Sequence, residues 1–223
     1  MTSAGVLFDV DGTLVDTNYL HVVAWWHAFR AQGHRVPMTD LHRTVGQGSD
    51  RLVETILGHA DAAVSQGHTD FYGPALYDVA AFPRAADLLR ATKEIGLRVV
   101  LATSASAKEV EHLTKAIGAD DAVDAVTTKD DVEASKPAPD VVQSALAAGD
   151  VDPGAAVFVG DTVWDVEAAR KAGLDCIAVL SGGISAAELT DAGAAAVYRD
   201  VAHLLDDLDD SAIGKLARRS TGQ

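Results

Sequence analysis

The feature that most constrains the fold is an alternation of short apolar runs with longer stretches of helical spacing. The runs have strand length and end in polar or small residues: Gly5–Val10, Leu97–Ala102, Ala122–Val126, Ala155–Gly160, Asp175–Leu180 and the weaker Ala195–Tyr198. Helical spacing is clear in Arg84–Ile95, which is followed by Gly96 as a stop signal. Strands that alternate with helices form parallel sheets covered on both faces.

One interval interrupts this alternation. Between Asp16 and Phe82 there is no convincing strand, whereas Tyr19–Ala31 and Ser49–Leu57 carry apolar residues at helical spacing. A stretch of about 65 residues is far too long for a loop, so a helical insertion is predicted after the first strand. The predicted fold class is α/β, with a Rossmann-like parallel sheet, helices on both faces and a small inserted α-helical domain. Residues 1–15 and 83–223 would form the core domain and residues 16–82 the insertion.

Net charge limits the partners that this chain can bind. It has 18 Lys and Arg against 33 Asp and Glu, a formal net charge of −15. This balance argues against nucleic-acid binding and against docking on anionic membranes, because both need a basic surface. An anionic substrate would need a local metal ion or lysine, because the overall field repels it.

Cysteine content and hydropathy indicate the compartment. Cys176 is the single cysteine, so a disulfide framework and a Cys/His zinc ribbon are excluded, and its strand pattern predicts an inert core thiol. There is no signal-peptide pattern, and no apolar run approaches the ~18 residues needed to cross a bilayer, so a cytoplasmic protein is expected. The polar tail from Asp209 onward is predicted to fray.

The first predicted strand ends in Asp9-Val10-Asp11-Gly12-Thr13. In an extended chain both carboxylates start on one face, and the carboxyl ends of parallel strands form the ligand crevice. Two carboxylates there repel each other, so they need a cation, a shared proton or different roles. An Asp-Gly hairpin turn is an alternative, with little support from the residues that follow. A calcium loop is excluded, because it needs Gly and Glu where Leu14 and Leu20 stand.

A second acidic pair follows another buried-strand pattern, in Gly160-Asp161-Thr162-Val163-Trp164-Asp165. If a helix begins here, Asp161 and Asp165 lie one turn apart and look into the crevice beside the first pair. Helix capping is an alternative for Asp165. For both pairs together a Mg²⁺ site is the better account, because hard oxygen ligands suit this ion.

Hydroxyl groups and a lysine could bind an anion beside these carboxylates. Thr103-Ser104 follows the strand 97–102 and would place hydroxyls and N–H groups at a helix N-terminus, where anions bind. A helix cap is the alternative, and it is compatible with anion binding. Ser135-Lys136-Pro137 places a lysine before a proline that suits a first helical turn. A lone lysine is usually a solvated charge, and spacing alone does not single it out.

Taken in order, these elements resemble the haloacid dehalogenase superfamily of phosphotransferases. Its pattern is D-x-D-G-T, Ser or Thr after a strand, Lys-Pro, then G-D-x-x-x-D before a helix, which here are Asp9–Thr13, Thr103, Lys136-Pro137 and Gly160–Asp165. The insertion resembles the helical cap of that superfamily, and Ala168–Gly173 is similar to the branch of phosphoglycolate phosphatases and β-phosphoglucomutases. Because dehalogenases and phosphonate-cleaving relatives lack an aspartate at the position of Asp11, neither activity is expected.

The resemblance implies a Mg²⁺-dependent phosphatase that hydrolyses a small phosphoglycolate- or sugar-phosphate-like phosphomonoester through an aspartyl-phosphate. Asp9 would be the nucleophile and Asp11 the general acid and base. The Mg²⁺ ligands would be Asp9, the Asp11 backbone carbonyl, Asp161 and Asp165, and the phosphoryl-binding residues Thr13, Thr103, Ser104 and Lys136. The partner would be a small phosphorylated metabolite, bound by a monomer or homodimer.

Two alternatives stay open from the sequence: a phosphomutase with the same core, and a non-catalytic binding protein with the same fold. In the sugar phosphomutases that this chain resembles, an arginine stands three residues after the cap-loop glycine. Here Ser49 holds that position relative to Gly46, and the nearest arginines are Arg43 and Arg51. The cap is expected to recognise the leaving group, with His21, Trp25, Trp26 and the loop Gly46–Ser49 as candidates.

Overall fold

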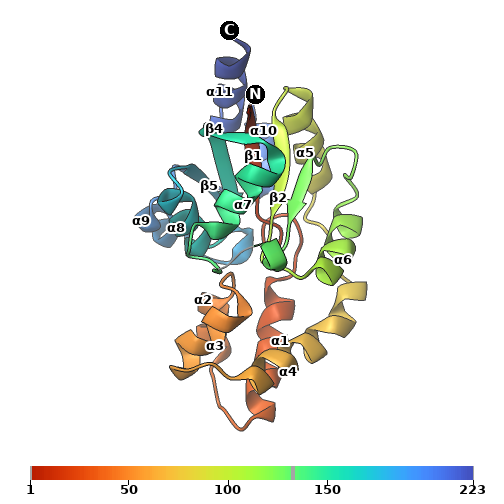
Figure 1. Cartoon of the computed structure of the whole chain (residues 1–223), viewed down its shortest axis with the longest axis vertical. Helices are drawn as coiled ribbons and strands as arrows, with labels where there is room; N and C mark the ends of the chain where they lie inside the picture. Colours follow the sequence, from red (N-terminus) through yellow and green to blue (C-terminus); the bar gives the residue numbers. More distant parts are fainter. Residues whose placement is uncertain (1, 132–133, 223) are drawn as a thin grey trace.

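A parallel sheet forms the centre of the molecule. The computed structural model describes residues 2–131 and 134–222, in which six strands follow the order β3-β2-β1-β4-β5-β6 (Figure 1). The strands are β1 (Ser3–Phe8), β2 (Arg98–Ala102), β3 (Ala125–Thr127), β4 (Val151–Gly160), β5 (Asp175–Val179) and β6 (Ala196–Tyr198). The predicted parallel α/β sheet is confirmed, and the largest shift in bounds is at β4, which begins at Val151 rather than Ala155.

Helices cover both faces of this sheet, because successive side chains of each strand point to opposite faces. Val6 and Phe8 of β1 pack into one hydrophobic cluster, and Leu7 packs into the other. The first cluster is completed by α5 (Ala85–Glu94), α6 (Ala107–Ile117), α10 (Val201–Asp206) and α11 (Ala212–Thr221); the second by α7 (Asp140–Gly149), α8 (Val163–Lys171) and α9 (Ala186–Ala192). Single 3₁₀ turns, η2 (Lys129–Asp131) and η3 (Leu180–Gly182), follow β3 and β5.

The stretch between β1 and α5 is helical. It contains α1 (Asn18–Ala31), α2 (Met38–Thr44), α3 (Ser49–Leu57), α4 (Ala62–Tyr72) and the 3₁₀ turn η1 (Gly73–Tyr77), which Figure 1 shows grouped beyond one end of the sheet. These helices enclose a hydrophobic cluster of their own around Trp25 and Phe29. The chain enters and leaves this helical stretch through two neighbouring segments. A hydrogen bond joins them, in which the Asp16 N–H donates to the Ala80 carbonyl at 2.9 Å. No helix in the described part of the chain is long and apolar enough to cross a membrane.

The C-terminal tail is helical and packed, so the prediction that it frays from Asp209 onward is wrong. Ser211 caps α11, and its Oγ accepts a hydrogen bond of 3.1 Å from the Ile213 N–H. Ile213 and Leu216 are buried in the hydrophobic cluster that α11 shares with β1. Because most residues of the tail are polar, its narrow apolar face is hard to recognise in the sequence. The helix is stabilised by packing of this face rather than by intrinsic helix propensity.

We expect Ile213→Ala to destabilise the protein, because a fully buried side chain is cut back in a packed core. The cost should be about 2–5 kcal/mol, which lowers Tm by roughly 4–20 °C in a domain of this size. Lys215 is exposed on the same helix, so Lys215→Ala is the matched control and should shift Tm little. Equal, small shifts for both variants in thermal denaturation would mean that the tail is not docked.

Candidate active site

Asp9 lies immediately beyond the central strand β1. Its backbone N–H still donates to the Val159 carbonyl of β4 at 2.8 Å, which holds the residue at the carboxyl end of the sheet. The chain then turns sharply, since the Leu14 and Val15 N–H groups both donate to the Val10 carbonyl. The turn leaves Asp9 buried, with 5% of the residue exposed, at the floor of a pocket between the sheet and the inserted helices.

Gly12 is required in this turn for two reasons. Its φ of 80° lies in the left-handed region, which side chains disfavour. A Cβ at this position would also lie 2.3 Å from Asn18 Nδ2 and 2.4 Å from Asp161 Oδ2, closer than any real contact. The motif glycine therefore allows the loop to pack directly on Asp161.

Asp11 points away from Asp9 and toward the inserted helices. Its Oδ1 accepts a hydrogen bond from Thr17 Oγ1 at 2.7 Å and lies 3.4 Å from His21 Nε2, while its Oδ2 accepts from Thr103 Oγ1 at 3.4 Å. The two side chains do not share one face as predicted, because β1 ends at Phe8 and the chain is not extended beyond it. Burial alone would raise the pKa of Asp11, but the contacts with His21 and Thr17 leave it below its ordinary value.

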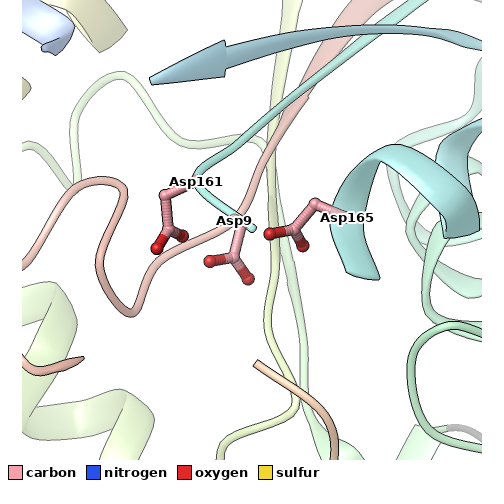
Figure 2. Close-up of side chains that lie close together, drawn as sticks. All are labelled: Asp9, Asp161 and Asp165. Carbon is pink, nitrogen blue, oxygen red and sulfur yellow. The ribbon is translucent and has the colours of Figure 1, made fainter. Parts of the chain in front are cut away.

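Three carboxylates do converge: Asp9, Asp161 and Asp165 (Figure 2). Each offers an oxygen that lies within 4.8 Å of the oxygens of the other two, and all three side chains are buried. Lys136 Nζ contacts Asp9 Oδ1 and lies 2.7 Å from Asp165 Oδ1. We call these three aspartates the acidic cluster.

Helix α8 begins differently from the expectation. Thr162 is the N-cap, so Asp161 precedes the helix and Asp165 is its third residue. Asp165 Oδ2 accepts hydrogen bonds from the Thr162 N–H (3.0 Å) and Thr162 Oγ1 (2.6 Å), while its Oδ1 faces Lys136. Asp165 thus caps the helix and belongs to the acidic cluster at once, so the two interpretations are compatible.

Asp161 is held from both sides by neutral donors. Its Oδ1 accepts from Thr13 Oγ1 and its Oδ2 from Asn18 Nδ2, both at 2.8 Å. Thr13 Oγ1 also lies 3.3 Å from Asp9 Oδ2, but its single proton favours the shorter contact. Asn18 is the first residue of α1, and its contact with Asp161 has no signal in the sequence, because asparagine at a helix start is ordinary capping.

The acidic cluster carries more negative charge than its neighbours neutralise. Burial raises the pKa of Asp9 well above its ordinary value, and Asp165 and Asp161 add to this against the opposing charge of Lys136. Burial and repulsion from Asp165 raise the pKa of Asp161 to about 7. Burial alone would lower the pKa of Lys136, but Asp165 and Asp9 raise it above its ordinary value, so this lysine stays cationic.

These carboxylates fit a divalent metal ion. Among the described residues, the salt bridges to the acidic cluster come from a single cation, Lys136. Hard oxygen donors in a buried, negatively charged site are the ligands that such ions prefer. The carboxylate of Asp11 does not belong to the acidic cluster. Metal binding by the Asp11 backbone carbonyl stays a prediction.

The predicted phosphoryl-binding residues lie around the same point. Thr103, Ser104 and Lys136 line the pocket together with Asp9, whereas Thr13 is fully buried behind it. Thr103 Oγ1 accepts a hydrogen bond of 3.0 Å from the Ala105 N–H, as in a helix-start turn. The tertiary structure therefore brings residues from β1, β2 and the segment before α7 to one place.

The inserted helices form the other wall of a cavity of about 190 Å³. Of the residues predicted to face it, His21, Trp25 and the loop Gly46–Ser49 do so. Trp26 instead packs under Arg30, whose guanidinium carbon lies 4.5 Å from its ring centroid.

Two further lining residues, His68 and Tyr72 of α4, were not anticipated. Their rings stack on Trp25 and His21, each at a centroid distance of 4.0 Å. No sequence signal marked them, because both occur in an ordinary helical pattern. Burial holds the pKa of His68 well below its usual range, and the charge interaction with His21 lowers it further. The neutral ring of His68 is therefore favoured.

Comparison with known proteins identifies the family. Residues 6–179 match the family described as haloacid dehalogenase-like hydrolase. The chain belongs to this family. The family assignment confirms the resemblance derived from the motifs, and with it the expectation of an enzyme.

Individual members of the haloacid dehalogenase-like hydrolases agree with this. CbbY from Cereibacter sphaeroides is 33% identical over 190 residues, covering 77% of this chain and 82% of that protein. Pyrophosphatase PpaX from Bacillus thuringiensis (strain Al Hakam) is 30% identical over 183 residues, covering 78% and 82%. The crystal structure of a hydrolase from Pseudomonas syringae superimposes with a TM-score of 0.87 at 30% identity, covering 93% and 98%. This haloacid dehalogenase-like hydrolase is accordingly an enzyme of the phosphatase type.

Proposed function

We propose that this enzyme is a Mg²⁺-dependent phosphatase that hydrolyses a small phosphomonoester through an aspartyl-phosphate on Asp9. The observation that carries the proposal is the setting of Asp9. It is a buried carboxylate at the floor of a pocket, in contact with one lysine and beside two further carboxylates. The order of motifs around it, which resembles that of the family, supports the same role.

The metal ion would be held by the acidic cluster and by the Asp11 backbone carbonyl. When bound, Mg²⁺ offsets the repulsion between the Asp9 carboxylate and the phosphate and stabilises charge on the phosphoryl oxygens. Thr13 and Asn18 orient the Asp161 carboxylate from behind, each through a 2.8 Å hydrogen bond. They would keep this ligand in one rotamer whether or not the ion is present.

In the first step an Asp9 oxygen forms a bond to phosphorus while the ester P–O bond breaks. The leaving oxygen takes a proton from Asp11, which Thr17 and His21 hold on the side of the inserted helices. An approaching anionic substrate raises the pKa of Asp11, because like charges favour its protonated form. Lys136, Thr103 and Ser104 would bind the phosphoryl oxygens.

In the second step water attacks phosphorus, and the P–O bond to Asp9 breaks. Asp11, now ionised, accepts the proton that the water loses. The products are inorganic phosphate and the free Asp9 carboxylate, so both residues return to their starting states. Covalent catalysis of this kind divides one difficult displacement into two easier ones.

The size of the cavity supports a small leaving group. Its volume of about 190 Å³ lies below the ~300–1,000 Å³ of pockets for drug-sized ligands. Residues 16–82 would serve as the cap that closes over the substrate, with His21 and the loop Gly46–Ser49 in contact with it. The substrate would be a small phosphorylated metabolite.

We expect hydrolysis rather than phosphoryl transfer between two positions of a sugar. A mutase must hold a second phosphate with a cationic group in the cap. Arg43 instead pairs with Glu188 on the surface at 2.9 Å, and Arg51 is exposed and lies outside the pocket lining. Ser49, at the position where the related sugar phosphomutases carry arginine, does line the pocket.

The test is incubation with β-glucose 1-phosphate and, separately, with phenyl phosphate, in the presence of Mg²⁺. Free phosphate and glucose 6-phosphate are followed, with and without a catalytic amount of glucose 1,6-bisphosphate. The proposal requires phosphate release from at least one substrate. Efficient isomerisation with negligible phosphate release would assign a mutase, and no turnover over a wider panel of phosphomonoesters would assign a non-catalytic binding protein.

A further inference from the structure

Two buried hydroxyls in the pocket have no hydrogen-bond partner within the described part of the chain. They are Tyr72 Oη and Ser104 Oγ. A third buried oxygen in the same condition, Asp165 Oδ1, lies 2.7 Å from Lys136 Nζ and is accounted for by that ion pair. Buried polar groups are nearly always paired, so each exception calls for an explanation. Both residues line the cavity, which points to the ligand as the missing partner.

The two residues lie on opposite walls of the cavity. Ser104 follows Thr103 on the core side, among the residues proposed to bind the phosphoryl group. Tyr72 is the last residue of α4 on the cap side, and only 1% of its surface is exposed. Tyr72 therefore lies on the side of the leaving group rather than of the phosphoryl group.

Ring contacts place Tyr72 close to the reacting end of the leaving group. Its ring stacks on His21 with centroids 4.0 Å apart and an interplanar angle of 21°. His21 Nε2 in turn lies 3.4 Å from Oδ1 of Asp11, the residue proposed to protonate the leaving oxygen. Tyr72 is thus separated from Asp11 by one imidazole ring.

The position of the Tyr72 ring is fixed by packing. Ala24 and Leu76 form a hydrophobic cluster with it, and His68 stacks beside it at a centroid distance of 5.5 Å. A hydroxyl on a ring held in this way is preorganised, so a bond to substrate costs little ordering.

The charges around Tyr72 indicate the chemistry that it would bind. Burial, together with the carboxylates of Asp11 and Glu109, raises the pKa of the phenol, so it stays a neutral donor. The pocket-lining lysines other than Lys136, Lys108 and Lys129, are exposed. An uncharged hydroxyl oxygen suits this inner position better than a carboxylate or second phosphate, because Asp11 and Glu109, the carboxylates that act on the phenol, are negative.

We propose that Tyr72 is a specificity-determining residue, whose hydroxyl bonds an uncharged hydroxyl group of the leaving group near the ester oxygen. The substrate is then a polyol or sugar phosphate, rather than a phosphomonoester with a plain hydrocarbon or a carboxylate at that position. This inference rests on the proposed phosphatase function and narrows its substrate class.

The experiment compares Tyr72→Phe with the wild type on matched pairs of phosphomonoesters. One pair is sn-glycerol 3-phosphate and n-propyl phosphate; another is glucose 6-phosphate and tetrahydropyran-2-ylmethyl phosphate, which has the same ring without hydroxyls. The readout is the ratio of kcat/KM within each pair. The wild type should prefer the hydroxylated member of at least one pair, and Tyr72→Phe should lower that ratio about tenfold, as expected for one lost hydrogen bond.

Tyr77→Phe is the matched control, because it removes a tyrosine hydroxyl five residues away that is exposed and outside the pocket lining. It should leave the ratio unchanged. Tm provides a second readout: Tyr72→Phe removes no bond within the protein, so its Tm should not fall, whereas a purely structural hydroxyl would lower it.

Several results would overturn the inference: no preference in any pair, a preference that persists in Tyr72→Phe, a lower Tm for that variant, or fastest hydrolysis of 2-phosphoglycolate. Hydrolysis of phenyl phosphate distinguishes these results from a failure of the proposed phosphatase function. If the wild type with Mg²⁺ cleaves phenyl phosphate and the ratios do not respond, only the role of Tyr72 is wrong. If it cleaves no phosphomonoester at all, the phosphatase proposal fails and the inference with it.

Discussion

Replacing Asp9 with asparagine should abolish turnover while the fold survives. An amide is a poor nucleophile and a weaker metal ligand, so Asp9→Asn removes the covalent step and disturbs the metal site together. The loss in kcat should be roughly four orders of magnitude or more, the scale found when a nucleophile is removed. Steady-state phosphate release measures it.

The fold of Asp9→Asn should be retained, because the carboxylate that is lost is one of three crowded in the acidic cluster. Lys136 keeps Asp165 as a partner at 2.7 Å. Asp16→Asn is the matched control, since Asp16 is exposed, and it should keep nearly full activity. Retention of even a tenth of wild-type kcat in Asp9→Asn would exclude Asp9 as the nucleophile.

Removing the metal ion should have an effect of similar size. Chelator-treated enzyme should be inactive and should recover on addition of Mg²⁺, because the acidic cluster otherwise repels a phosphate dianion. Ca²⁺ should restore little activity, since it accepts looser and higher coordination. Asp161→Ala should raise the Mg²⁺ concentration needed for half-maximal activity, while Asp120→Ala, an exposed aspartate, should not. Full activity in excess chelator would refute the metal-dependent mechanism.

The same site predicts how pH changes the stabilisation by Mg²⁺. The pKa of Asp161 is about 7 in the folded, metal-free protein, above its ordinary value near 4. Between those pH values the folded state holds a proton that the unfolded state has lost, so the stability contributed by this group falls as pH rises. Mg²⁺ needs the ionised carboxylate, and it should therefore stabilise the protein increasingly over this range.

Thermal denaturation with Mg²⁺ and with chelator, repeated from about pH 4 to about pH 7, measures this difference. The gap in Tm between the two conditions should widen with pH. Because titrating groups outside the acidic cluster contribute equally in both conditions, the gap reports on the cluster itself. A constant gap, or one that narrows, would contradict ion binding at Asp161.

Much of the architecture could be predicted from residue pattern. Strand-length apolar runs such as 97–102 and 155–160 predicted a parallel sheet buried on both faces, because a strand covered on both faces is apolar along nearly its whole length. Asp9, Thr103 and Asp161 could be placed near one another for a related reason, since each follows a strand and parallel strands all end at one edge.

Other features were decided by the tertiary structure. The apolar face of α11 consists of few residues in a polar segment, and only contact with the sheet shows that Ile213 and Leu216 are buried. Asp9 and Asp11 lie two residues apart, yet they face different partners because the chain turns directly after β1. Neither the burial of this helix face nor the partners of the two aspartates follows from a local pattern. Each depends on which residues the rest of the chain places beside them.

The pocket-lining residues of α4 belong to this second kind. His68 and Tyr72 have no motif, and they line the pocket because α4 packs on α1 with these side chains toward Asp11. The proposed catalytic positions can be recognised in the sequence, because their chemistry restricts them to particular residue types at the ends of strands. The residues on the other wall of the pocket are determined by the packing of helices, because many sequences satisfy the same spacing and only the folded chain determines which side chain faces the pocket.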